Sequence, residues 1–99
     1  MNYINKEVIV RCKNAGVFFG TITEFNSATA EATIKDCRRI WYWEGAASLS
    51  QLALEGTKRP SECKFTVTIP EMCVMQVIEV IPCSEEAIKS IKSVPTWKM

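Results

Sequence analysis

Residues 6–34, KEVIVRCKNAGVFFGTITEFNSATAEATI, decide the fold of this chain. Apolar and polar residues alternate in three parts of it, and this period of two is typical of β-strands. The three predicted strands are residues 6–13, 17–25 and 28–34. Asn-Ala-Gly and Asn-Ser lie between them and are short turn signals, so the segment predicts an antiparallel meander. Gly20, inside the second strand, predicts a bulge or a sharp bend.

Three further strands are predicted downstream, at residues 37–43, 64–69 and 73–81. In the second of these we expect Phe65, Val67 and Ile69 to be buried and Pro70 to end the strand. The third is almost entirely apolar, which indicates a strand covered on both faces.

Two helices complete the pattern. Ser48 begins the first, with Gln51 placed as in a capping box and Gly56 at its end. Ser84 begins a short C-terminal helix with Ile88 and Ile91 on its buried face. We therefore expect one domain, residues 1–99, of the α+β class. It is predicted to be a small, strongly bent antiparallel sheet or open barrel of about six strands, with one inserted helix and the C-terminal helix.

Composition limits the classes of function. The 12 basic and 11 acidic residues give a net charge of +1, whereas proteins that bind duplex nucleic acid carry a clear basic excess. The chain has no histidine, and no nucleophile elbow, phosphate-binding glycine loop or dinucleotide fingerprint is present. We therefore expect no enzyme activity, no metal, no cofactor and no duplex partner.

Size and apolar runs give two more expectations. No run approaches the roughly twenty apolar residues that a membrane-spanning helix needs, so we expect a cytoplasmic protein without a membrane partner. A domain this small buries a modest fraction of its surface, so we also expect a homo-oligomer. The five cysteines are widely spaced, without a C-x-x-C pair, and are predicted to be reduced, buried thiols.

The candidate site is residues 38–51, RRIWYWEGAASLSQ. Guanidinium groups bind phosphate, flat rings stack on nucleobases, and the first N–H groups of a helix attract anions. The predicted ligand-binding residues are Arg38, Arg39, Trp41, Tyr42, Trp43, Ser48 and Ser50. Alternation along the strand sends the two arginines to opposite faces, with Trp41 and Trp43 on the face of Arg39. The same residue types also pack cores and anchor protein interfaces.

Residues 38–53, RRIWYWEGAASLSQLA, resemble the signature of a family of short proteins of unknown function encoded mainly in tailed bacteriophages and prophages. The segments AGVFFG at 15–20, CKF at 63–65 and IEVIPC at 78–83 are also similar to that family. Glu44 stands where the family usually has aspartate. The resemblance implies a viral origin and a location in the cytoplasm of a bacterial host.

Two functions compete on this basis. The first is a phage-encoded binding protein that sequesters a phosphorylated nucleotide signal, such as a cyclic oligonucleotide or an ADP-ribose derivative, and so antagonises host antiviral defence. The second is a protein–protein interaction module that directly inhibits a host enzyme or defence effector. A virion or housekeeping component whose aromatic residues pack an oligomer is a third reading.

Overall fold

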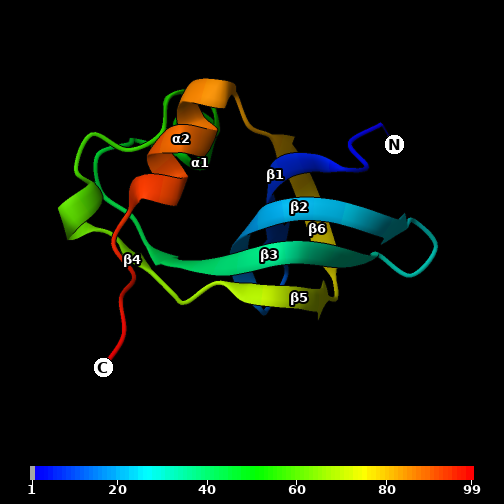
Figure 1. Cartoon of the computed structure of the whole chain (residues 1–99). Coiled ribbons are helices and arrows are strands. Elements are labelled where there is room, and N and C mark those ends of the chain that lie inside the picture. The colour runs from blue at the N-terminus through cyan, green and yellow to red at the C-terminus, as the bar shows by residue number, and fades with distance from the viewer. Residues whose placement is uncertain (1) are drawn as a thin grey trace.

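The computed structural model describes residues 2–99 and contains six strands and two α-helices (Figure 1). The elements are β1 (Lys6–Cys12), β2 (Gly16–Asn26), β3 (Glu31–Tyr42), α1 (Leu49–Glu55), a 3-10 turn (Pro60–Glu62), β4 (Lys64–Phe65), β5 (Ile69–Val74), β6 (Val77–Pro82) and α2 (Glu85–Ser93). The predicted meander forms β1, β2 and β3, which pair antiparallel in sequence order. The α+β class is confirmed.

One sheet holds all six strands and is not closed: five follow the order β4-β3-β2-β1-β6, and β5 is off this path beside β3. β5 pairs with the first half of β3, between Ala32 and Cys37, and β4 pairs with its far end. Residues 28–34 and 37–43, predicted as two strands, are thus mostly one long strand. Figure 1 shows α1 and α2 together on one side of this sheet, at the end where β4 lies.

Gly20 marks the predicted bend. Phe19 pairs with Arg38 and Thr21 pairs with Lys35, so β3 carries one extra residue opposite Gly20. A Cβ atom at Gly20 would lie 2.8 Å from the Lys35 carbonyl oxygen, so only glycine permits this close approach of β3. Asp36 has φ of 51° at the same bulge. The bulge therefore bends β3 sharply enough for its two halves to pair with different strands.

Two hydrophobic clusters cover the two faces of the sheet. The inner cluster lies within the bend and consists of Val8, Val10, Cys12, Phe18, Ile22, Ala32, Ile34, Cys37 and Val74. The helix-side cluster consists of Ile9, Phe19, Ile40, Leu52, Ala53, Cys63, Phe65, Ala87, Ile91 and Val94. Ile9 interrupts the alternation of β1 because it packs under the helices, on the face opposite Val8 and Val10.

The prediction of one strand at residues 64–69 is wrong. β4 ends at Phe65, and β5 begins at Ile69 and continues through Pro70. Proline is tolerated there because β5 is an edge strand, and its pairing to β3 steps from Ile69 to Glu71 without using Pro70. Phe65 is buried as predicted, but Val67 and Ile69 are exposed.

The prediction of a single strand at residues 73–81 is also wrong. The chain turns at Met75 and Gln76, and Gln76 has φ of 58°. This turn separates β5, which pairs with β3, from β6, which pairs with β1. Ile78 on β6 is exposed, so this strand is not covered on both faces. The turn could not be predicted because residues 73–81 are mostly apolar and contain no glycine or proline to mark it.

Both predicted helix starts are confirmed. The Ser48 hydroxyl accepts a hydrogen bond from the Gln51 amide, and the Ser84 hydroxyl accepts one from the Ala87 amide. Gly56 ends α1 with φ of 76°. Within residues 2–99, neither helix has the length and hydropathy required to cross a bilayer.

Candidate functional site

Arg38 is buried and acts as a clamp within the fold. Its Nη1 donates to the carbonyl oxygens of Ile91 and Val94, each at 3.1 Å, at the C-terminal end of α2. Nη2 donates to Phe65 at 3.3 Å and Nε to Thr66 at 3.2 Å, both carbonyl acceptors. Burial lowers the pKa of Arg38. Because these bonds engage both Nη atoms and Nε, we do not propose Arg38 as a ligand-binding residue.

Arg39 points to the opposite face, as predicted from the alternation of β3. Its guanidinium carbon lies 4.9 Å from the centre of the Phe18 ring. Among residues 2–99 no carboxylate forms an ion pair with Arg39, and its buried Nε has no hydrogen-bond partner. It lines a hollow of about 370 Å³. Arg39 is therefore available to an anion, although not together with Arg38.

Trp41 is the ring that the fold leaves most open. β3 pairs Ile40 with Phe65 and Tyr42 with Lys64, so Trp41 is the extra residue of a bulge. A bulge redirects a side chain, and Trp41 is 63% exposed.

Trp97 stacks on Trp41 across the neighbouring strand. The ring centroids are 6.2 Å apart and the planes differ by 8°. The Nζ atom of Lys64 lies 5.5 Å from the centre of the Trp97 ring. The Trp97 backbone N–H donates to the Phe65 carbonyl oxygen at 2.8 Å, which fixes the segment that carries it. We call Trp41, Trp97 and Lys64 the indole surface.

The other two predicted rings are less available. Tyr42 is exposed, but its hydroxyl is already engaged, because it donates to the Glu44 carboxylate. This hydrogen bond is the main cause of a raised pKa of Tyr42. Trp43 lies beyond the end of β3, packs against the helix-side cluster and donates from Nε1 to the Ala46 carbonyl oxygen at 3.2 Å.

The start of α1 is an ordinary capped helix end. Ser48 accepts from the Gln51 amide at 3.1 Å, and the Gln51 side chain accepts from the Ala47 amide at 2.7 Å. With only seven residues, α1 offers a weak dipole to an anion. Ser50 is exposed within the first turn. These contacts give the helix start a structural role that needs no ligand.

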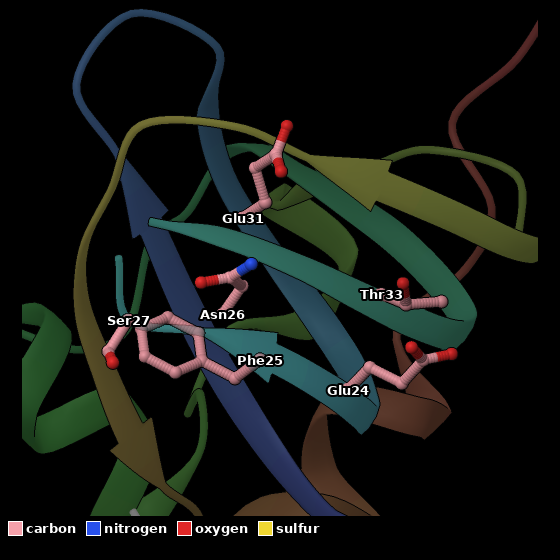
Figure 2. A pocket seen from close by; sticks show the side chains of 6 residues that line it. All are labelled: Glu24, Phe25, Asn26, Ser27, Glu31 and Thr33. Carbon is pink, nitrogen blue, oxygen red and sulfur yellow. The ribbon is translucent and has the colours of Figure 1, made fainter. Parts of the chain in front are cut away.

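A hollow at the β2–β3 hairpin is acidic (Figure 2). Its volume is about 520 Å³, and its lining residues are Glu24, Phe25, Asn26, Ser27, Glu31 and Thr33. Figure 2 shows Glu24 and Thr33 close together at one end, with Glu31 set apart from them. Two carboxylates without a cationic residue repel phosphate, so this hollow does not suit a nucleotide.

The cysteines are free, and their environments differ. Cys12, Cys37 and Cys63 are buried and Cys83 is half-buried, whereas Cys73 is exposed, against the prediction that all five are buried. Burial raises the pKa of Cys37 to about 11 and that of Cys83 to about 12. No group of three or more potential metal ligands occurs in the part of the chain that the structure describes.

These environments predict the thiol reactivity of the native protein. At pH 8, we expect an aromatic disulfide reagent to modify Cys73 within minutes and the other four thiols at least about 100-fold more slowly, because burial keeps the reagent away from them. Colorimetric titration of native and urea-unfolded protein measures this difference. A Cys73→Ser control should remove the fast phase; a fast phase of two or more thiols would contradict the burial pattern.

Together these features describe a small α+β protein that offers a surface of exposed rings and an unpaired guanidinium. A family model described as Domain of unknown function (DUF6948) matches residues 5–91, and the chain belongs to this family. No curated protein and no solved structure matches the chain significantly.

Proposed function

We propose that this protein acts by binding another protein through the indole surface, so that it blocks a host enzyme or defence effector. The observation that carries the proposal is the exposure of two stacked indoles, Trp41 at 63% and Trp97 at 46%. Tryptophan is among the residues most enriched at energetically dominant interface positions. The adjacent Lys64 ammonium favours a partner that places a carboxylate beside its apolar contact.

Magnitudes favour a protein partner over a free nucleotide at this surface. Stacking one base on an indole contributes about 1–3 kcal/mol, and an exposed charge pair with Lys64 adds about 0–1 kcal/mol. A total of at most about 4 kcal/mol corresponds to a Kd near 1 mM. Sequestering a signal requires far tighter binding. A protein partner buries both indoles in a larger area, where truncating one such anchor costs about 2 kcal/mol or more.

Replacing Trp41 by alanine tests this function. We expect Trp41→Ala to weaken partner binding by about 30-fold or more, with little loss of stability because most of the ring is exposed. The immobilised protein is first used to capture a partner from bacterial lysate, which mass spectrometry identifies. The dissociation constants of both variants for the purified partner are then measured.

The matched control is Leu54→Ala. Leu54 is 64% exposed on α1, so it has the same exposure as Trp41 but lies outside the indole surface. A partner that binds wild type and Trp41→Ala equally, or that is lost equally with Leu54→Ala, would refute the proposal. Calorimetric titration with cyclic oligonucleotides and ADP-ribose derivatives tests the alternative. Micromolar binding that needs Trp41 and Lys64 would make nucleotide capture the better account.

The biological setting is part of the same proposal. The similarity of residues 38–53 to phage and prophage proteins supports a role inside an infected bacterium, and the charge of +1 supports a partner other than duplex nucleic acid. Self-association of the small domain would place several indole surfaces on one particle and raise avidity for a multimeric target.

A further inference from the structure

We propose that the hollow lined by Arg39 binds a small organic anion, with a carboxylate or phosphate monoester on Arg39 and an apolar body against Met72 and Met75. The hollow lies between the turn that joins β1 to β2 and the segment running from β5 into β6. Its lining residues are Asn14, Ala15, Phe18, Arg39, Met72, Cys73, Val74, Met75 and Gln76. This site is separate from the indole surface and goes beyond the proposed function.

The charge of Arg39 has no ion-pair partner among the residues that the structure describes. The three ion pairs among residues 2–99 involve Arg11, Arg59 and Lys92, and Arg39 is in none of them. Its Nε lies buried without an acceptor among these residues, and an unsatisfied buried donor costs about 1–3 kcal/mol. A carboxylate or phosphate accepts from guanidinium N–H groups in a forked geometry. In this hollow we expect it to accept from the Nη groups of Arg39, because Nε is closed to solvent.

The neighbouring thiols do not neutralise this charge. Cys12 and Cys37 are close enough to the guanidinium for its charge to affect their pKa values, but burial dominates and raises both. The two thiols are therefore uncharged at neutral pH. Arg39 remains a net positive charge at the edge of an apolar core.

The walls determine the remainder of the ligand. Met72, which packs against the inner cluster and is partly buried, and the exposed Met75 give the hollow an apolar side, whereas Phe18 and Val74 are themselves buried. At the rim, the Asn14 amide donates to the Gln76 side-chain oxygen at 3.0 Å and joins the two turns. A volume of about 370 Å³ lies at the small end of the range for small-molecule pockets, roughly 300–1,000 Å³. One charged group and one flat or branched apolar body fill this space.

Titration followed by NMR tests the site directly. The probes are phenyl phosphate and phenylacetate, which share a ring and differ in the anion, together with neutral benzyl alcohol. Both anions are expected to shift the Arg39 Nε–H resonance downfield and to perturb the amides of Ala15 and Gln76, with saturation in the micromolar to low millimolar range. Benzyl alcohol should leave the Nε–H resonance unchanged. The stronger of the two anions identifies the preferred head group.

Two variants separate the site from a general surface effect. Arg39→Gln is expected to weaken binding of the preferred anion at least tenfold, whereas Arg11→Gln, which removes an exposed guanidinium paired with Glu79, should not change it. Ala15→Trp fills the hollow without altering Arg39 and serves if Arg39→Gln does not fold; it should also abolish binding.

Three results would overturn the proposal: no Nε–H shift with either anion at 10 mM, equal shifts with benzyl alcohol, or saturation unchanged in Ala15→Trp. The outcome is independent of the proposed function, because the Trp41-dependent capture of a protein is measured without any added anion.

Discussion

Replacing Arg38 by methionine is expected to lower the free energy of unfolding by about 3–5 kcal/mol, because it removes four hydrogen bonds from a charged donor. Arg38 is 5% exposed. Its side chain donates to four carbonyl oxygens, two at the C-terminal end of α2 and two at the end of β4. Methionine fills part of the volume but leaves these acceptors without donors. An orphaned buried acceptor costs about 1–3 kcal/mol, and partial rehydration limits the total.

Urea unfolding followed by circular dichroism measures this loss. Arg38→Lys keeps a charge but has fewer donors in a different geometry, so it should lose an intermediate amount. Arg59→Met is the surface control, because Arg59 is exposed and its contact with Glu62 is 3.8 Å long. We expect this control to change stability by less than about 1 kcal/mol. A loss below about 1 kcal/mol in Arg38→Met would show that the clamp is not stabilising.

Gly56→Ala is the second substitution with a large expected effect, a loss of stability of about 2–6 kcal/mol. Gly56 has φ of 76° and ψ of −160°, a region that is essentially restricted to glycine. A Cβ atom there would lie 2.2 Å from the Ser90 Cβ on α2. The substitution therefore combines backbone strain with overpacking between the two helices, and each contributes about 1–3 kcal/mol.

Gly16→Ala separates the two causes. Gly16 has φ of 109°, but a Cβ atom there meets nothing within 4 Å, so alanine adds strain without a clash. We expect Gly56→Ala to lose more stability than Gly16→Ala in the same urea experiment. Combining Gly56→Ala with Ser90→Gly should restore part of the difference, as a favourable coupling in a double-mutant cycle. Equal losses in the two alanine variants would contradict the close packing of Gly56 on α2.

The parts of the fold that depend on local signals could be predicted from the sequence. Alternation and turn residues give the meander, and Ser48 and Ser84 begin helices because a hydroxyl satisfies an N–H group whose position is set by neighbours in the chain. The 69–82 region could not be predicted in the same way. Its apolar run contains a turn at Gln76 because β5 and β6 pair with different, distant strands, and non-local pairing leaves no local signature.

The candidate site divides along the same line. The period of a strand predicts that Arg38 and Arg39 point to opposite faces, and in the structure they do. The hydrogen bond from Arg38 to the end of α2 joins residues 53 positions apart in the chain. The stacking of Trp97 on Trp41 also joins residues that are distant in the sequence. Neither contact could be predicted from local patterns. A tail tryptophan is predictable only as a residue that docks somewhere.

The hydrogen bond between the Trp97 backbone and Phe65 has a consequence for recognition kinetics. Phe65 also accepts from Arg38, so one buried peptide group connects the tail to the end of α2. The second indole is therefore preorganised, and a partner loses little conformational entropy in meeting it. An encounter with such a surface resembles docking to a preformed shape, so differences in affinity between partners are expected mainly in their dissociation rates.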